Sequence, residues 1–262
     1  SDVYKRQGGE PWTEKPWKWL FQVIGKSKVP IMNSAGGTEV SGSILHCCLH
    51  RPFKVGSFNA PIPGMSADIL NLDGKKVSTN EMGELVMRKS SIGLTKSLWN
   101  DDKRYIDNYW SVIKDYWVHG DLASRDADGH WYLHGRSDDT IKVSGKRIGP
   151  SELESVIVKS GKAKEVAAVG IPDENKGSKI ILSIVPAENN DQKESFFEDL
   201  VIKDLGKSFK PDKVIFVKDL PKTRNMKIMR RVIKSCLANQ DPGDLSTLLN
   251  PESVEEIRSH AI

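Results

Sequence analysis

The chain has 262 residues, is 38% hydrophobic and 28% charged, and carries a formal net charge of +4 at pH 7. This length suits one or two domains with a buried core, and the lack of any uncharged apolar run of about 18 residues excludes a membrane-spanning helix. Three cysteines are too few for a disulfide framework and favour a reducing compartment, so we expect a cytoplasmic protein.

The amino-terminal stretch divides into a leader, a helix and a strand. Residues 1–7 hold neither an initiator Met nor an apolar stretch, so they do not have the form of a signal peptide, and we expect a non-native leader there. Residues 19–24 predict a short helix that ends at Gly25, and residues 29–32 predict a buried strand that leads into a glycine loop.

Residues 51–136 have the signals of β structure. Short apolar runs are separated by clusters of turn-forming residues at 61–64, 73–74 and 128–129. This pattern predicts a small barrel or an open sheet.

Helices and strands alternate after Arg136. The expected elements are a helix that begins near Ser151, strands at 165–171 and 179–185, a helix at about 192–205, and a strand at 213–217. This alternation predicts a second, compact α+β domain, with the boundary near Asp138.

A basic segment runs from Lys203 to Lys234. It holds eleven Lys or Arg residues against three Asp residues. Such a segment favours a polyanionic partner. A solvated helix face explains the same charges equally well, and charge alone does not separate the two interpretations.

Four motif blocks follow one another along the chain: residues 33–39 (NSAGGTE), 117–121 (WVHGD), 135–150 (GRSDDTIKVSGKRIGP) and 221–231 (PKTRNMKIMRR). Each block alone is a weak signal, whereas four in this order and spacing are specific. Together they resemble the adenylate-forming superfamily, most closely its acetyl-CoA synthetase-like short- and medium-chain acyl-CoA synthetases, from about residue 8 to the end of the chain.

The resemblance implies an α+β fold in two parts. Residues 8–137 would be the C-terminal part of the large AMP-binding domain, with the glycine loop and a small β-barrel-like subdomain. Residues 138–262 would be a small, mobile lid domain, and Asp138 lies at the position of the hinge between the two.

In the first part, the resemblance places the nucleotide against the glycine loop. Gly36 and Gly37 have no Cβ, so the backbone can closely approach a flat ligand. The Thr38 hydroxyl is suited to a phosphate oxygen. The Glu39 carboxylate is suited to Mg²⁺, which prefers oxygen ligands and substrate phosphates. Read without the resemblance, the loop is a turn with a helix-capping Thr.

Three charged residues complete the implied nucleotide site. Asp121 resembles the aspartate that accepts hydrogen bonds from both ribose hydroxyls, and Arg136 resembles a second ribose contact. Arg147 resembles a donor to the α-phosphate, for which a planar guanidinium is well shaped. Taken alone, Asp121 reads as a turn residue, and Arg136 as the partner of Asp138 in a surface ion pair.

The lid would carry the remaining functional residues. Ser144 and Gly145 resemble the loop that lies along the pantetheine arm of CoA. Lys227 resembles the lysine that is brought to the bond-forming site, where its ammonium would stabilise developing negative charge. The usual Ser-Gly before this lysine is Asn225-Met226 here, which makes the loop bulkier and stiffer. Without the resemblance, Lys227 is one of eleven basic residues.

Gly36 also bears on the acyl group. Acetate-restricted members of the family carry Trp at this position, which closes the acyl pocket. Hydrogen in place of an indole leaves space for several methylenes, each contributing about 0.8 kcal/mol on burial. We therefore expect a carboxylate longer than acetate.

The resemblance implies an acyl-CoA ligase that uses ATP, Mg²⁺ and coenzyme A. An acyl-adenylate would form from ATP and a carboxylate, and the CoA thioester would follow with release of AMP. Expected partners are these small molecules and the missing N-terminal part of the same protein, and not nucleic acid.

Residues 1–29 contain no counterpart of the family's phosphate-binding loop, so we expect an incomplete, inactive fragment. A non-enzymatic nucleotide-binding fragment and an adenylation domain serving a carrier protein remain alternatives.

Overall fold

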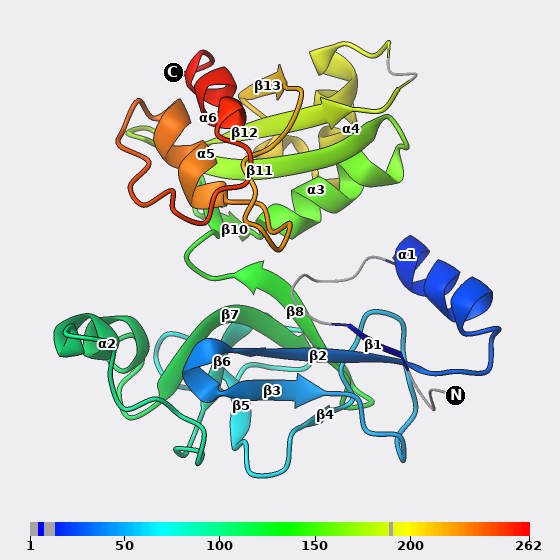
Figure 1. Cartoon of the computed structure of the whole chain (residues 1–262), viewed down its shortest axis with the longest axis vertical. Coiled ribbons are helices and arrows are strands. Elements are labelled where there is room, and N and C mark those ends of the chain that lie inside the picture. Colours follow the sequence, from blue (N-terminus) through cyan, green and yellow to red (C-terminus); the bar gives the residue numbers. More distant parts are fainter. Residues whose placement is uncertain (1–4, 8–13, 189–190) are drawn as a thin grey trace. The chain divides into compact units, whose positions relative to one another are not determined.

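The computed structural model describes residues 5–7, 14–188 and 191–262. The chain forms two compact units that divide between Asp138 and Asp139 (Figure 1). Within the described part of the chain, no helix combines the length and the apolar character that crossing a membrane requires.

The first unit is built mainly of strands. Its elements are β1 (Lys5–Gln7), α1 (Glu14–Trp19) with a π-helical turn (Leu20–Ile24), β2 (Ile31–Gly37), a 3-10 turn (Thr38–Val40), β3 (Gly42–His46), β4 (Ala60–Pro61), β5 (Ala67–Leu70), β6 (Gly83–Met87), α2 (Asp102–Tyr109), β7 (Trp117–Arg125) and β8 (Trp131–Arg136). The predicted helix at 19–24 is therefore the second half of a longer helical segment. The segment is capped by Gly25, whose N–H donates to the Leu20 carbonyl.

Two four-stranded sheets organise this unit, in the orders β1-β2-β3-β4 and β5-β6-β7-β8. The β1–β2 pair is parallel and the other pairs are antiparallel. An isolated bridge between Phe58 and Trp131 joins the two sheets. Of the two forms that the sequence allowed for this region, the described residues adopt open sheets and no closed barrel.

The core of the first unit lies against β6 and β7. All five residues of β6 are buried, because the strand is paired on both sides and a hydrophobic cluster covers each face, one holding Leu85 and Met87 and the other Val86. Trp117, at the start of β7, is buried and stacks on Tyr109 of α2, with ring centroids 5.3 Å apart and planes 2° from parallel. This contact packs α2 against the sheet next to the glycine loop.

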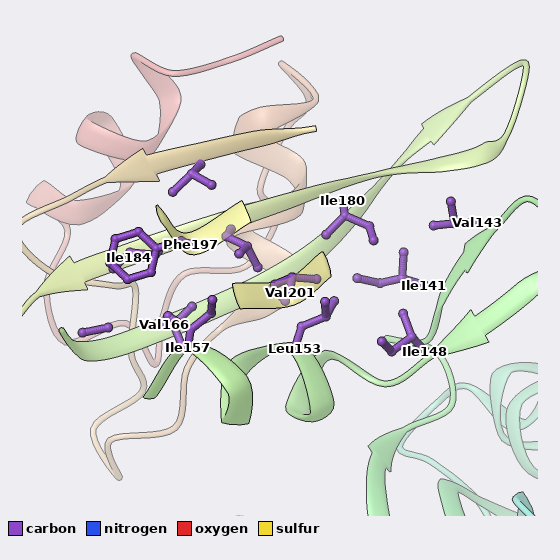
Figure 2. Packing of buried hydrophobic residues seen from close by; sticks show 14 residues of the cluster. Ile141, Val143, Ile148, Leu153, Ile157, Val166, Ile180, Ile184, Phe197 and Val201 are labelled. Atoms are coloured by element: carbon purple, nitrogen blue, oxygen red, sulfur yellow. The ribbon is translucent and has the colours of Figure 1, made fainter. Parts of the chain in front are cut away.

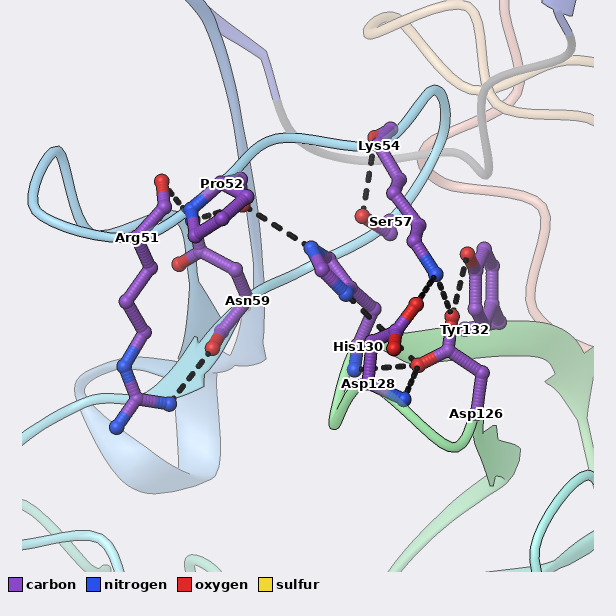
Figure 3. A network of polar contacts seen from close by, with 9 residues as sticks. All are labelled: Arg51, Pro52, Lys54, Ser57, Asn59, Asp126, Asp128, His130 and Tyr132. Atoms are coloured by element: carbon purple, nitrogen blue, oxygen red, sulfur yellow. Dashed lines mark hydrogen bonds and ion pairs between the residues drawn. The ribbon is translucent and has the colours of Figure 1, made fainter.

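Figure 3 shows a polar network that fastens the loop before β4 to the β7–β8 turn. Lys54 Nζ lies 2.6 Å from Asp126 Oδ2 and 2.6 Å from Asp128 Oδ2. His130 Nε2 lies 3.0 Å from the Pro52 carbonyl oxygen. Burial raises the pKa of Asp126, but the Lys54 ammonium and the His130 backbone N–H outweigh burial and lower this pKa from 3.8 to about 2.

The second unit is a sheet with helices on both faces. Its elements are β9 (Ile141–Val143), β10 (Lys146–Ile148), α3 (Pro150–Lys159), β11 (Ala163–Asp173), β12 (Gly177–Pro186), α4 (Glu194–Leu205), a 3-10 turn (Lys207–Phe209), β13 (Lys213–Phe216), α5 (Arg230–Leu237) and α6 (Glu252–Arg258). The sheet order is β11-β12-β13, with β11 antiparallel and β13 parallel to β12. The strands and helices expected in this region are all present.

Alternate residues of the central strands belong to two different hydrophobic cores, because successive side chains of a strand point to opposite faces. Ile180, Leu182 and Ile184 pack against α3 and α4, as Figure 2 shows for Leu153, Ile157, Phe197 and Val201. Ile181 and Val185 face the other way, toward α5 and α6. Each fully buried aliphatic side chain of this kind contributes about 1.5–3 kcal/mol.

An ion pair connects three elements of this unit. Arg230 at the start of α5 donates from Nε and Nη2 to the two carboxylate oxygens of Glu154 in α3, at 2.9 and 2.7 Å. The backbone N–H of Ala168 in β11 donates to the same carboxylate at 3.0 Å. This two-point geometry orients α5 directly after the loop that carries Lys227.

Candidate functional site

The glycine segment at the end of β2 lies very close to β3. The pairing register shifts between Ala35 and Gly36. A Cβ on Gly36 would lie 2.1 Å from the carbonyl oxygen of Gly42 and 2.4 Å from Cα of Ser43. Only glycine permits this approach, so no side chain at position 36 can project toward a ligand unless β2 and β3 separate.

Gly37 and Glu39 lie beside a buried histidine. A Cβ on Gly37 would meet Glu39 Oε2 at 2.9 Å and His119 Cε1 at 3.0 Å. Glu39 Oε1 accepts a hydrogen bond from the Tyr109 hydroxyl at 3.0 Å, which orients the half-buried carboxylate. Thr38 is exposed at the start of the 3-10 turn.

Asp121 and Arg136 face each other across the β7–β8 pair. Arg136 Nη1 lies 3.6 Å from Asp121 Oδ1 and donates to the His119 carbonyl oxygen at 2.9 Å. Arg136 Nε also lies 3.2 Å from Asp138 Oδ1, at the edge of the unit. Gly120, with φ +82°, allows the guanidinium to lie across it, since a Cβ there would be 2.5 Å from Arg136 Nη2. The surface ion pair of Arg136 with Asp138 and the contact with Asp121 therefore coexist.

His119 was given no role from the sequence, although it lies inside one of the four motif blocks. Its Nε2 lies 3.3 Å from Asp121 Oδ2, and its ring packs 5.4 Å from that of Trp117. Burial lowers the pKa of His119, and the negative charge of Asp121 opposes this shift only in part. The available signal was a histidine directly before Gly-Asp in a buried strand.

In the second unit, Ser144 and Gly145 form the two-residue turn between β9 and β10. Both have positive φ, +49° and +80°, as a type I′ hairpin turn requires. Both are exposed, and the Ser144 N–H donates to the Lys176 carbonyl at 2.8 Å. Arg147 is exposed on β10, opposite Lys142 of β9. The hairpin therefore exposes the backbone of its turn to solvent, beside the side chains of Lys142 and Arg147.

Lys227 lies in a short exposed loop that is closed at its base by the bridge between Lys222 and Ile228. The Thr223 N–H donates to the Lys227 carbonyl at 2.9 Å, and the Met226 N–H donates to the Thr223 carbonyl at 2.8 Å. Met226 takes φ +64°, a left-handed conformation that favours glycine. The loop thus holds a bulky residue where its backbone suits a glycine.

Lys222 is a buried lysine beneath this loop, and sequence reasoning missed it. Its Nζ lies 2.6 Å from Glu165 Oε2 and 2.6 Å from Asp219 Oδ1. Asn250 accepts from the Lys222 N–H at 3.0 Å and donates to Asp219 at 2.7 Å. Burial lowers the pKa of Lys222, but the two carboxylates outweigh it and raise the pKa. The only sequence signal was that Lys222 follows a proline within the basic segment.

The predicted site residues are divided between the two units. Gly36, Gly37, Thr38, Glu39, Asp121, Arg136 and Asp138 belong to the first unit, and Ser144, Gly145, Arg147 and Lys227 belong to the second. In the first unit, Gly37, Glu39, Asp121 and Arg136 all lie around His119. In the second unit, the Lys227 loop and the β9–β10 hairpin are separate features.

Comparison with known proteins gives the family. Residues 3–99 match the AMP-binding enzymes, and residues 152–227 match the AMP-binding enzyme C-terminal domain. Acetyl-coenzyme A synthetase of Methanothrix soehngenii is 37% identical over 259 residues, which cover 95% of this chain and 38% of that protein. The chain belongs to the adenylate-forming AMP-binding enzymes. The resemblance stated from the four motif blocks is confirmed.

A second relative and a solved structure also match nearly the whole chain. Acetyl-coenzyme A synthetase of Pasteurella multocida is 36% identical over 261 residues, 95% of this chain and 40% of that protein. Acetoacetyl-CoA synthetase from Streptomyces lividans shares the fold, with a TM-score of 0.84 at 22% identity over 97% of this chain and 40% of that chain. The chain therefore spans about two fifths of the length of these relatives, and the predicted α+β fold class is confirmed.

Proposed function

We propose that this chain is the C-terminal part of an AMP-forming acyl-CoA ligase. In the first step, a carboxylate oxygen attacks the α-phosphorus of ATP, the new P–O bond forms, and the bond to pyrophosphate breaks. In the second step, the sulfur of CoA attacks the acyl carbonyl carbon, the bond to AMP breaks, and the thiol proton is released. The observation that carries the proposal is the Asp121–Arg136 pair beside the glycine segment, in a chain similar to acetyl-coenzyme A synthetases.

The nucleotide would bind in the first unit. Asp121 keeps acceptor capacity on its carboxylate oxygens for the ribose hydroxyls, and Arg136 would add a second contact. Gly36 and Gly37 would let the backbone approach the base, and the exposed Thr38 hydroxyl would contact a phosphate.

Glu39 is the candidate ligand for Mg²⁺. Its carboxylate is half-buried and oriented by Tyr109, and a hard oxygen donor of this kind fits the ion. Within the described residues no three metal-ligating side chains converge, so phosphates and water would complete the coordination. When bound, the ion would neutralise phosphate charge.

The second unit would supply mobile cations and the CoA contact. The exposed Lys227 ammonium would stabilise the negative charge that develops at the α-phosphorus, and Arg147 would contact the same phosphate. The bare backbone at Ser144 and Gly145 would lie along the pantetheine arm. The division of the chain after Asp138 supports a hinge at that residue, about which one lid could serve both steps.

For the acyl group we propose a short- or medium-chain carboxylate longer than acetate. No side chain at position 36 can close an acyl pocket, because the Cβ direction of Gly36 is filled by the backbone of β3. The similarity to acetyl-coenzyme A synthetases makes acetate the competing substrate.

A chimera tests the proposal. The chain would replace the matching C-terminal part of the Methanothrix soehngenii acetyl-coenzyme A synthetase and be assayed beside the 262-residue chain alone. We expect the chimera to release pyrophosphate with ATP and butyrate or hexanoate, and the chain alone to release none. A folded chimera that binds ATP but forms no adenylate with any of acetate, butyrate, hexanoate or octanoate contradicts the ligase assignment. Activity with acetate alone contradicts the assignment of chain length.

A further inference from the structure

His119 is a buried titratable residue that the proposed reaction does not yet use. Its side chain is 6% exposed, and its Nδ1 is buried without a hydrogen-bond partner among the described residues. Its Nε2, by contrast, lies 3.3 Å from Asp121 Oδ2. The Nε2 edge of the ring therefore faces a carboxylate acceptor, whereas the Nδ1 edge makes no hydrogen bond within the part of the chain that the structure describes.

The groups around the ring favour one of its two neutral tautomers. The charged groups that face it are Asp121, Arg136 and Glu39, from β7, β8 and the 3-10 turn. A carboxylate can only accept a hydrogen bond, so the proton must be on Nε2 for the contact with Asp121 to be favourable. The Nδ1 atom makes no hydrogen bond among the described residues, which is consistent with a neutral Nε2–H imidazole. The Gly36 carbonyl is a second acceptor beside the ring, and it too favours a protonated ring nitrogen.

Asp121 is therefore approached by a donor at each oxygen. His119 lies at Oδ2, and Arg136 lies 3.6 Å away at Oδ1. Arg136 also donates to the carbonyl oxygen of His119 at 2.9 Å, which links the two donors through the backbone. The imidazole thus lies within hydrogen-bond distance of one oxygen, and the guanidinium attracts the other electrostatically, so the two contacts together favour one orientation of the carboxylate.

We propose that His119 is a positioning residue of the nucleotide site, which as a neutral Nε2–H imidazole orients the Asp121 carboxylate toward the ribose hydroxyls of a nucleotide. This inference rests on the proposed function, since it gives Asp121 its ribose role. It assigns His119 a role in discrimination between riboses as well as in packing.

The first test needs no ligand. Long-range ¹H–¹⁵N NMR spectra of the ¹⁵N-labelled 262-residue chain at pH 7 report which ring nitrogen carries the proton. The His119 signals are assigned by their loss in His119→Phe. We expect a neutral ring protonated on Nε2. A ring protonated on Nδ1, or a charged imidazolium, overturns the proposal whatever the chain binds.

The second test separates positioning from packing. Ligand-observed NMR titrations compare AMP with 2′,3′-dideoxy-AMP for the wild type, His119→Gln and His119→Phe. Gln places an amide N–H near the position of Nε2, whereas Phe keeps the ring volume without a donor. We expect wild type and His119→Gln to prefer AMP by about tenfold, and His119→Phe to lose most of that preference, since one oriented hydrogen bond to a charged group corresponds to about a tenfold effect or more.

The outcomes distinguish the inference from the proposed function. If His119→Phe weakens both nucleotides equally and keeps the preference for AMP, His119 only packs and the inference is wrong. If the wild type binds both nucleotides equally, or binds neither, the ribose role of Asp121 is wrong, and with it the nucleotide part of the proposed function. Far-UV circular dichroism melts of each variant verify that the fold is intact.

Discussion

The absence of a side chain at Gly36 allows β2 and β3 to pack closely. The resemblance gives this residue a role in the acyl pocket, whereas the structure gives it a local role as well. The hydrogen atoms on its Cα allow β2 to come within contact of the β3 backbone, where a Cβ would lie 2.1 Å from a carbonyl oxygen. Neither atom of that contact belongs to a flexible side chain, so the clash can be relieved only by moving backbone.

A pair of substitutions tests this packing. We expect Gly36→Ala to lower the free energy of unfolding of the first unit by about 1–3 kcal/mol, as overpacking does. Gly42→Ala is the matched control, because a Cβ there meets nothing within 4 Å. All seven Trp residues precede residue 139, so Trp fluorescence during urea titration reports on the first unit. Equal effects of the two substitutions would contradict the close approach.

Met226 is the second residue whose backbone conflicts with its side chain. A φ of +64° destabilises a non-glycine residue by about 1–2 kcal/mol. Glycine avoids this strain, but its greater conformational entropy in the unfolded chain lowers stability by about 0.4–1 kcal/mol. We therefore expect Met226→Gly to be more stable than Met226→Ala by about 0.5–1 kcal/mol. Amide hydrogen exchange in β11 and β12 measures this, because the second unit contains no Trp. A more stable alanine variant would show that the turn relaxes away from positive φ.

At the scale of elements, ion pairs hold together segments that are distant in the sequence. The Lys54 network fastens one loop to the β7–β8 turn, and the Arg230–Glu154 pair fastens α5 to α3 and β11. In both cases the partners are far apart in sequence, so each pair closes a long loop. Removing one partner leaves the other charge without its counterion.

The attachment of the Lys54 loop should depend on pH in the acid range. The pKa of Asp126 is lowered from 3.8 to about 2 in the folded chain, so its stabilising contribution is present above about pH 4 and is lost as the pH falls toward 2. We expect the stability of the first unit to decline over that range and Lys54→Met to remove this component of the decline. Trp fluorescence at a series of pH values measures it. Identical pH profiles for the two proteins would contradict the assignment.

At the scale of the whole molecule, the chain divides where the proposed hinge residue lies. The Asp121–Arg136 pair and the glycine segment belong to one unit, and Lys227 and the Ser144–Gly145 turn belong to the other. In the proposed function, the second unit would be a lid with Lys227 on one loop and the CoA-contacting turn on another, so it could serve two consecutive reactions. The roles of these two loops can therefore be separated kinetically.

Lys227→Ala in the chimera described above tests this separation. We expect adenylate formation to fall by about 10²–10³-fold, the usual effect of losing one charge-stabilising contact, while thioester formation from supplied acyl-adenylate is retained. Pyrophosphate release and CoA thioester formation are measured separately. Lys234→Ala, which removes an exposed lysine from α5, is the control. An equal loss of both half-reactions would show that Lys227 does not act in the adenylation step alone.

By itself the amino-acid sequence determined the family, the α+β class and most elements of the second unit. The motif blocks are contiguous, and the periodicities of a strand or helix depend on neighbours within a few residues, so both can be read locally. The predicted strand at 213–217, for example, corresponds to β13 at Lys213–Phe216.

Only the tertiary structure decided which residues meet. The pairing of His119 with Asp121 and Arg136 depends on the register of β7 against β8, including a shift between Leu122 and Ala123. The burial of Lys222 depends on Glu165, which lies in another strand. These contacts are set by how strands and loops pack at long range, and no local pattern of residues encodes that packing.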